Sequence, residues 1–397
     1  MTGTSNCYLY CGYFFIKIKK MSRNFFKYPV IILMIVSVLF VACNNKKTEK
    51  ESSNTRAQSD STGADITKKE PKPISEPLIT TIYTADPSAH VFNGKIYIYP
   101  SHDIESGKQQ DDEGGHFDMK DYHVLSMDSI GGKVTDNGVA LDIKNVPWAG
   151  RQMWAPDAAY ANGMYYLYFP VKDKNGVFHI GVAVSSSPVG PFKAEAEPIK
   201  ESYSIDPAVF KDDDGKFYMY FGGIWGGQLQ RWVTGKFDPY GSKTDLKKDD
   251  EPAIAPRVVR LNKNMTHFDE VVREIQILDK NGKQLLGKDH NRRFFEASWM
   301  HKYNGKYYYS YSTGDTHFIC YATGDNPYGP FTYQGVVLNP VIGWTNHHSI
   351  VEINGKWYLF YHDSVLSGGQ THLRSVKVTQ LHYNPDGSIQ TVDAYVN

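Results

Sequence analysis

The chain has 397 residues, of which 43 are Lys or Arg and 43 are Asp or Glu, so its formal net charge is zero. Nucleic-acid-binding proteins usually carry a basic excess or a basic patch, and this balance argues against a nucleic-acid partner. Three of the four cysteines, Cys7, Cys11 and Cys43, lie near the N-terminus, which leaves only Cys320 for the rest of the chain. The folded part therefore has to rest on a large core and not on internal disulfides.

The first 42 residues have the pattern of a secretory signal. They contain five basic residues and no acidic one, and they end in the apolar run 29–42, which is shorter than the roughly 20 residues of a membrane span. Val41-Ala42-Cys43 resembles a bacterial lipoprotein cleavage box, with Phe40 where leucine is usual. We therefore expect 1–42 to be removed as a signal peptide, with Met21 as an alternative start. An ordinary signal peptide and an uncleaved anchor are the alternatives.

Residues 43–77 are expected to form a lipid-anchored, flexible linker. From Cys43 onward this segment is rich in Lys, Glu, Ser, Thr, Asn and Pro and has no aromatic residue, so it cannot bury enough apolar surface to offset the entropy of ordering. The remaining residues, 78–397, suit one large domain. The expected location is that of an exported bacterial lipoprotein, in the periplasm or on the outer-membrane surface, which contacts the membrane only through its N-terminal lipid.

Five copies of one sequence unit follow one another after the linker. Each copy has a short lead segment, then an Asn-Gly or Asp-Gly pair, and then a run of aromatic and β-branched residues that is typical of a strand. The glycines of these pairs are Gly94, Gly163, Gly215, Gly305 and Gly355. Because Asn-Gly and Asp-Gly supply the positive φ angles of a type I′ turn, each copy predicts a β-hairpin.

A second repeated element indicates that the unit has about four strands. Residues 187–192 (Ser-Pro-Val-Gly-Pro-Phe) match residues 326–331 (Asn-Pro-Tyr-Gly-Pro-Phe), and each run lies between two predicted strands. Four-stranded units with a period of about 50 residues are typical of propeller blades. We therefore predict an all-β fold, a five-bladed β-propeller with four-stranded antiparallel blades. A β-sandwich is the competing architecture, but it does not explain why reactive residues precede the lead strands.

Each lead strand opens with a polar residue. These residues are Asp86, Asp157, Asp206, Glu296 and His347. In a propeller the first strand of every blade begins at the central axis, so the five side chains are expected to meet there. A single Asp-Pro pair is more often a turn, but three carboxylates at equivalent positions of one repeat favour a shared site. Glu296 stands between aromatic neighbours, and such surroundings raise the pKa of a carboxyl, as a general acid requires.

Three carboxylates around one axis suit the hydrolysis of a glycosidic bond. That reaction needs one carboxyl to protonate the leaving oxygen and another to activate water or attack carbon. A third can orient and tune the acid. Tryptophans at loop-like positions offer flat faces for sugar rings, although core packing is the alternative for any one of them. They are Trp148, Trp154, Trp225, Trp299 and Trp344.

The ordered set of motifs resembles glycoside hydrolase family 43, the five-bladed propeller group of β-xylosidases, α-L-arabinofuranosidases and arabinanases. The segments that carry the resemblance are 84–88 (Thr-Ala-Asp-Pro-Ser), 153–157 (Met-Trp-Ala-Pro-Asp), 204–208 (Ser-Ile-Asp-Pro-Ala), 295–298 (Phe-Glu-Ala-Ser) and 347–349 (His-His-Ser). The resemblance implies that Asp86 is the general base, Glu296 the general acid and Asp206 the residue that orients and tunes the acid, with inversion of anomeric configuration. It assigns no chemistry to Asp157, which we expect to be structural.

The resemblance also implies binding roles. Trp154 is expected to face the sugar, Arg374 resembles a substrate-contacting arginine of the β-xylosidase branch, and His348 is expected among the substrate-binding residues. His347 corresponds to a histidine that helps hold an axial calcium ion largely through waters, although Asn346 replaces the usual preceding glycine. No cofactor is implied for the chemistry itself. A structural histidine at 347 and a surface ion pair at 374 are the alternatives.

The function expected from this resemblance is an inverting exo-glycosidase, a β-xylosidase, acting on xylan- or arabinan-derived oligosaccharides. An α-L-arabinofuranosidase and an endo-arabinanase are the alternatives within the class. Outside the class, a noncatalytic carbohydrate-binding propeller on the cell surface is the competing hypothesis. Such a protein would be expected to lose one of the three carboxylates, and all three are present.

Overall fold

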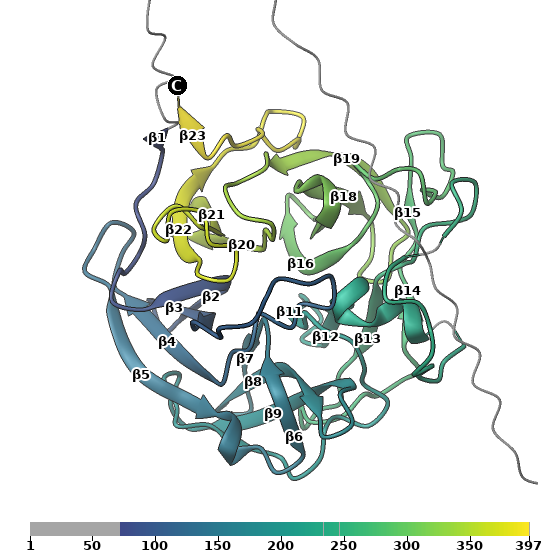
Figure 1. Ribbon diagram of the computed structural model, residues 1–397. Helices are drawn as coiled ribbons and strands as arrows, with labels where there is room; N and C mark the ends of the chain where they lie inside the picture. The colour runs from purple at the N-terminus through teal and green to yellow at the C-terminus, as the bar shows by residue number, and fades with distance from the viewer. Residues whose placement is uncertain (1–71, 233, 246, 397) are drawn as a thin grey trace, which may run out of the picture. The chain divides into compact units, whose positions relative to one another are not determined.

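The computed structural model describes residues 72–232, 234–245 and 247–396. The predicted signal segment and residues 43–71 of the predicted linker lie outside the described residues. Within the described part of the chain, no helix is long and apolar enough to cross a membrane. Five small sheets are arranged around a central axis, which confirms the predicted five-bladed β-propeller (Figure 1).

The blades follow one another in chain order, and each sheet is numbered here as one blade. Blade 1 consists of β2 (Tyr83–Phe92), β3 (Lys95–Asp103), β4 (Asp121–Met127) and β5 (Thr135–Asp142). Blade 2 consists of β6 (Ala149–Met153), β7 (Asp157–Ala161), β8 (Met164–Asp173), β9 (Phe178–Ser185) and β10 (Lys193–Ala194). Blade 3 consists of β11 (Ala208–Lys211), β12 (Phe217–Phe221), β13 (Arg257–Arg260) and β14 (Arg273–Glu274).

Blade 4 consists of β15 (Ile277–Leu278), β16 (Glu296–Tyr303), β17 (Lys306–Ser312), β18 (Ile319–Gly324) and β19 (Phe331–Leu338). Blade 5 consists of β20 (His348–Ile353), β21 (Lys356–Asp363) and β22 (Ser375–Leu381). The short 3-10 helices are η1 (Ile143–Asn145), η2 (Trp225–Gly227), η3 (Leu229–Trp232) and η4 (Gly314–Thr316). The prediction of four antiparallel strands holds for blades 1 and 3, whereas β15 adds a parallel strand to blade 4 and blade 5 has three strands.

The ends of the described chain close the ring beside blade 5. The strand β1 (Lys72–Pro73) pairs with β23 (Tyr395–Val396), and the two lie together in Figure 1. The segment that follows β1 runs along β22, where the Leu78 amide donates to the Val376 carbonyl at 2.8 Å. Backbone that would otherwise be an unpaired sheet edge is thereby covered. Among the described residues, contacts with the propeller are therefore present from Lys72 onward, within the segment 43–77.

The hairpin turns have the predicted conformation in four of the five units. Asn93, Asn162, Asn304 and Asn354 have φ angles between 48° and 53°, and the glycine after each also has a positive φ. Both central residues of a type I′ turn need this conformation, which asparagine and glycine adopt at little cost. The turn of blade 3 differs, because only Gly215 is left-handed and its amide donates to the Asp212 carbonyl.

Tyrosines on the second strands join neighbouring blades. Tyr99, Tyr168 and Tyr220 occupy the same place in their repeats, five residues after the turn glycine, and each is fully buried. Their hydroxyls donate to backbone carbonyls of the next blade, at Pro188 (2.7 Å), Met265 (2.9 Å) and Pro327 (2.7 Å). A buried tyrosine needs a partner for its hydroxyl, and here that need fixes the spacing between blades.

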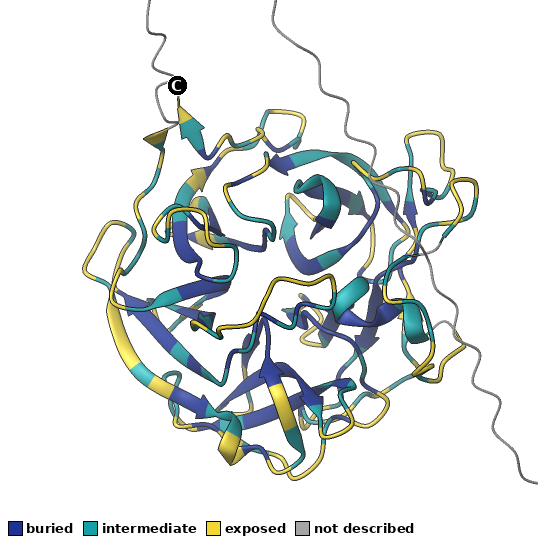
Figure 2. Cartoon of the chain, in the orientation of Figure 1, coloured by how far each residue is buried: buried dark blue, intermediate teal, exposed yellow. Residues whose placement is uncertain are grey.

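Three of the polar residues that open the lead strands, Asp86, Asp206 and Glu296, line the axial pocket and lie in backbone irregularities. Asp86 and Asp206 have φ angles of 49° and 56°, and Ala297, directly after Glu296, has a φ of 63°. The strands β2 and β16 both shift register at this point. Such bulges re-aim side chains and are frequent next to active sites. The lead strands are mostly buried, in contrast to the outer strand β5 (Figure 2).

Candidate active site

A pocket at the axis receives residues from every blade. Its volume is about 720 Å³, including the mouth that is open to solvent. The lining includes the three predicted carboxylates Asp86, Asp206 and Glu296, together with Trp154, His347 and Arg374. The structure therefore brings together six of the seven residues that the sequence analysis selected. The seventh, His348, does not line the pocket.

Asp86 is held in its ionised form. Its carboxylate accepts hydrogen bonds from the Arg374 guanidinium at 2.9 Å and from the Ser101 hydroxyl at 2.7 Å. Burial alone would raise the pKa of Asp86, but the guanidinium, the nearby histidines and the Ser101 hydroxyl outweigh burial and lower this pKa to about 2. The Asp86 amide donates to Nδ1 of His362, which fixes the bulge. At any ordinary working pH this residue carries a negative charge.

Arg374 is buried and not part of a surface ion pair. Its Nε and one terminal nitrogen bind the two carboxylate oxygens of Asp103 at 2.8 and 2.7 Å. The other terminal nitrogen reaches Asp86 and the Thr345 hydroxyl at 3.0 Å. Burial would lower the pKa of Arg374, but Asp103 and Asp86 raise it above its usual range. The guanidinium therefore stays charged and bridges two buried carboxylates.

Glu296 and Asp206 form a second, protonated part of the site. Burial, with a contribution from the charge of Asp86, raises the pKa of Glu296 to about 8, against the opposing effect of Arg374. Burial also raises the pKa of Asp206, and the charges of Glu296 and Asp86 raise it further. The Asp206 carboxylate accepts the Ala297 amide at 2.7 Å, a bond that suits an ionised carboxylate. Because the two carboxyls repel each other when charged, the pair keeps a proton at neutral pH, and the bonding places it on Glu296.

Aromatic side chains form the walls of the pocket. Trp154 is fixed by a hydrogen bond from its indole nitrogen to the Phe117 carbonyl at 2.8 Å and packs edge-on against the Phe117 ring. Trp225, Phe295 and Trp344 also line the pocket and are in mutual contact, with ring centroids 5.3 to 5.8 Å apart. Such faces suit the apolar sides of sugar rings. Of the other tryptophans noted in the sequence, Trp299 is buried in β16 and Trp148 packs against Phe169.

Two long connections meet over one side of the pocket. The segment between β3 and β4 extends across the centre of the ring (Figure 1), and its residues 110–117 contribute to the pocket lining. Glu113 of this segment binds Arg231 at 3.1 Å and Lys243 at 2.6 Å, both from the insertion between β12 and β13. Gly114 lies against Trp154, where a Cβ atom would come within 2.6 Å of the indole. The two connections thus narrow the access to the carboxylates.

The adjacent histidines His347 and His348 have different surroundings. His347 lines the pocket, with Nε2 3.8 Å from an oxygen of Asp206, and this nitrogen is buried without a hydrogen-bond partner. His348 is fully buried, and its Nε2 lies 2.6 Å from the Ser310 hydroxyl of blade 4. The expectation that His348 binds substrate therefore gains no support from its position, which joins blades 4 and 5. The reason is the alternation of side chains at the start of β20, which turns the two imidazoles apart.

His347 was also the candidate metal ligand, and its surroundings decide how an ion could be held. Calcium prefers several oxygen ligands. Among the described residues, His347 belongs to no group of three or more His, Cys, Asp or Glu side chains close enough to share an ion. Its free Nε2 fits an ion that is bound largely through waters. It does not fit a cage of protein ligands.

The residues that support the carboxylates carry no motif that distinguishes them in the sequence. Asp103, Ser101 and His362 lie at the ends of strands with no motif of their own, yet each bonds Asp86 or Arg374. A buried arginine needs a carboxylate partner, so a search for a counter-charge to Arg374 could have suggested Asp103. The pocket residues of 110–117 gave no comparable signal, because a long irregular segment has no periodicity.

Comparisons with known proteins agree with this site. The sequence profile of the glycosyl hydrolases family 43 matches residues 74–389. A xylosidase/arabinosidase of Bacteroides ovatus is 60% identical over 317 residues, which are 80% of this chain and 97% of that protein. A beta-xylosidase of Xylanibacter ruminicola is 57% identical over 312 residues, which are 78% of this chain and 97% of that protein.

A solved structure is similar over the same region. It is the calcium-free form of a family 43 beta-xylosidase/alpha-arabinofuranosidase from a compost microbial metagenome, in complex with xylotriose. The two chains are 71% identical with a TM-score of 0.81, and the match covers 82% of this chain and 100% of the other. With a family profile over most of its length, relatives near 60% identity and three carboxylates in one axial pocket, this chain belongs to the glycosyl hydrolases family 43 and is a glycoside hydrolase.

Proposed function

We propose that the enzyme is an inverting, exo-acting β-xylosidase that also accepts α-L-arabinofuranosides. The observation that carries this proposal is the division of the axial carboxyls into an ionised one, Asp86, and a protonated one, Glu296, in the same pocket. Glycoside hydrolysis requires this pair of states in both its inverting and its retaining form, and the choice of inversion rests on the family resemblance. The xylosidase and arabinosidase names of the relatives support the choice of substrate, as does the xylotriose bound to the similar structure.

In this mechanism Asp86 is the general base. Its ionised carboxylate takes a proton from a water molecule, which attacks the anomeric carbon from the side opposite the leaving group. Arg374 and Ser101 orient the carboxylate, and the charge of Arg374 keeps it ionised, although this also limits its basicity. Arg374 lines the pocket beside Thr345, where its guanidinium can also contact a sugar hydroxyl.

Glu296 is the general acid. It stays protonated up to about pH 8, so it can give its proton to the leaving oxygen at neutral pH. Asp206 maintains that state through its negative charge and is fixed by the Ala297 amide, which follows Glu296 directly in the chain. Trp154 and the aromatic group of Trp225, Phe295 and Trp344 stack on the sugar units. These roles agree with those that the family resemblance implies.

The covered pocket favours exo action. Glu113 connects the segment over the pocket to the insertion of blade 3, so a long polysaccharide would have to pass beneath two linked connections. An endo-arabinanase needs a cleft that is open at both ends. A noncatalytic binding propeller is disfavoured because it would have no need for a buried carboxyl whose pKa is raised to about 8.

Substitution of the two essential carboxyls should give different losses. With xylobiose, Glu296→Ala and Asp86→Ala should each lower kcat/KM by about 10²–10⁴-fold, the usual contribution of acid–base catalysis. With nitrophenyl β-D-xylopyranoside, Glu296→Ala should lose much less, because nitrophenolate leaves without protonation, whereas Asp86→Ala should stay equally impaired. Nitrophenyl α-L-arabinofuranoside, assayed in parallel, measures the second activity.

The exposed Asp128 provides a matched control, since Asp128→Asn removes a carboxylate that is not part of the pocket lining and should leave all rates unchanged. Proton NMR of the first sugar released should show the anomer opposite to that of the substrate. Retained configuration, or near-normal activity of Asp86→Ala, would overturn the assignment.

The pH profile should report the acid. Because the active form needs protonated Glu296, kcat/KM should fall as the pH rises through about 8. Asp206→Asn removes a negative charge that disfavours ionisation of Glu296, so the alkaline limb should move to lower pH by about one unit, the size of shift that one neighbouring charge commonly causes. An unchanged alkaline limb in this variant would contradict the role of Asp206, whatever happens to the rate at the optimum.

Calcium on the axis is a further part of the proposal, and it is assigned no catalytic step. His347 would help hold the ion through Nε2 and intervening waters, and the ion would supply positive charge that stabilises the crowded axis. Adding Ca²⁺ to EDTA-treated protein should then raise the melting temperature of the wild type but not of His347→Ala. An equal rise in both proteins would show that His347 takes no part.

For location we propose export and lipid attachment at Cys43, on the basis of the basic start, the short apolar run and Val41-Ala42-Cys43. These residues lie outside the described part of the chain. Mass spectrometry of the mature protein should find a lipid-modified N-terminal Cys43, and Cys43→Ala should abolish that modification. An unmodified terminus at another residue would refute the anchor while leaving export intact.

A further inference from the structure

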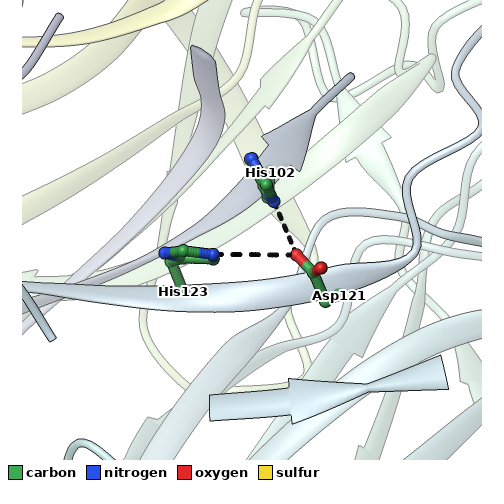
Figure 3. A group of neighbouring side chains, drawn as sticks. All are labelled: His102, Asp121 and His123. Carbon is green, nitrogen blue, oxygen red and sulfur yellow. Dashed lines mark hydrogen bonds and ion pairs between the residues drawn. The ribbon is translucent and has the colours of Figure 1, made fainter. Parts of the chain in front are cut away.

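A group of ligand-type side chains lies on blade 1 outside the active site. It consists of His102 on β3 and Asp121 and His123 on β4, and is called the outer histidine cluster here (Figure 3). Nδ1 of His102 is 2.6 Å from Oδ1 of Asp121, and Nε2 of His123 is 4.0 Å from the same oxygen. One ligand atom of each side chain lies within 4.8 Å of the other two. None of the three residues lines the axial pocket.

The sheet register produces this arrangement. β3 and β4 are antiparallel and pair as far as Ile98 and Leu125, and beyond that pairing the two strands keep His102 and Asp121 within 2.6 Å of each other. Residues 121 and 123 are two apart on one strand, so their side chains share a face of the sheet. All three side chains are partly buried, with exposed fractions between 12% and 21%. The cluster is therefore positioned by backbone pairing as well as by its own contacts.

A fourth residue orients the imidazole of His123. Nδ1 of His123 is 2.9 and 3.1 Å from the two carboxylate oxygens of Asp136 on β5, so this nitrogen carries the proton and donates it. The Gly138 amide in turn donates to Asp136 at 2.9 Å and fixes the carboxylate. Nε2 of His123 is left with a lone pair on the side of Asp121 and His102. A histidine that donates one ring nitrogen to a carboxylate and offers the other is the usual arrangement at metal sites.

We propose that the outer histidine cluster binds one divalent transition-metal ion of the zinc type. The ligand atoms are Nδ1 of His102, Nε2 of His123 and a carboxylate oxygen of Asp121, with water completing the coordination. Nδ1 of His102 donates to Asp121 when no metal is bound, so metal binding requires the His102 proton to be on Nε2. Two ligands of a tetrahedral zinc ion lie about 3.3 Å apart, between the two distances measured here, so small rotations of the imidazoles are sufficient. Two imidazoles and one carboxylate suit zinc, whereas calcium prefers oxygen ligands alone.

Such an ion would join β3 to β4 directly behind the active site. Asp103, which follows His102, points to the opposite face of β3 and binds Arg374. The metal would thus stabilise the strand that supports Arg374 without touching the pocket. Its first consequence is for the stability of blade 1, and no catalytic step depends on it.

Zinc titration of the metal-stripped full chain tests the site. Calorimetry with zinc chloride should show that His123→Gln and Asp121→Asn each bind one zinc ion fewer per chain than the wild type. Asp136→Asn should keep the site but weaken its affinity by about 10–100-fold, the usual effect of losing the residue that orients a ligand. The amount of zinc bound at cysteines or at histidines near the pocket is the same in the wild type and in these variants. A difference in zinc bound per chain therefore reports on the outer histidine cluster alone.

His290 provides the matched control, because its Nδ1 also contacts a carboxylate, that of Asp315 at 2.6 Å, without a second histidine. His290→Gln should bind as much zinc as the wild type. Xylosidase activity without metal should be unchanged in every variant, which verifies folding. If His123→Gln and Asp121→Asn bind zinc like the wild type, or if His290→Gln loses as much as they do, the proposal is wrong and the cluster is only a pair of hydrogen-bonded contacts.

Discussion

One guanidinium balances the buried negative charge at the axis of this propeller. Among the described residues that line the pocket, Arg374 is the only lysine or arginine, and the three axial carboxyls Asp86, Asp206 and Glu296 line the same pocket. Because it bonds Asp86 directly, the ionised form of that residue is favoured. Glu296 has no direct contact with the guanidinium, and burial together with the negative charge of Asp86 raises its pKa. The position of one cation therefore decides which carboxyl is the base and which is the acid.

Asp86 and Asp157 occupy equivalent positions in two blades, but one has a catalytic environment and the other a structural one. Asp157 opens blade 2 as Asp86 opens blade 1, but its carboxylate is satisfied within the protein. It accepts the Ala158 amide at 2.7 Å and lies 2.6 Å from Nε2 of His90, and it also bonds the Ser88 hydroxyl and the Val209 amide. These partners belong to blades 1, 2 and 3. Asp157 joins three blades and keeps no free oxygen for a substrate, as expected of a structural residue.

Much of this arrangement could be predicted from the sequence, because it repeats. The five hairpin turns gave the number of blades, and the equivalent lead positions gave the carboxylates. The role of His348 could not be predicted, since it depends on what stands opposite in blade 4. The residue opposite is Ser310, which stands at the repeat position where blades 1 to 3 have a tyrosine. Its small side chain leaves room for the imidazole. The segment 104–120 was also inaccessible to prediction, because its place over the pocket depends on ion pairs with a distant insertion.

The lowered pKa of Asp86 and the raised pKa of Glu296 have opposite effects on how the stability of the fold depends on pH. Asp86 has a folded-state pKa of about 2 against 3.8 for the free side chain, so it stabilises the fold above pH 3.8 by on the order of 2 kcal/mol, and this is lost as the pH falls through about 2. Glu296 has a folded-state pKa of about 8 against 4.5, so the folded state binds its proton more tightly than the unfolded chain does.

The stability contributed by protonated Glu296 is therefore present below pH 4.5, falls as the pH rises, and is lost by about pH 8, a change on the order of 3 kcal/mol between pH 4.5 and 7. The free energy of unfolding of a domain is typically only about 5–15 kcal/mol, so this pH-dependent change is a substantial fraction of the total stability. Hydrogen bonds between the blades help to compensate for this loss of stability. They are made by the tyrosines of the second strands and by Asp157. The packed blades thus keep Glu296 buried and protonated at the axis. An isolated pair of strands would open, and contact with water would let Glu296 ionise.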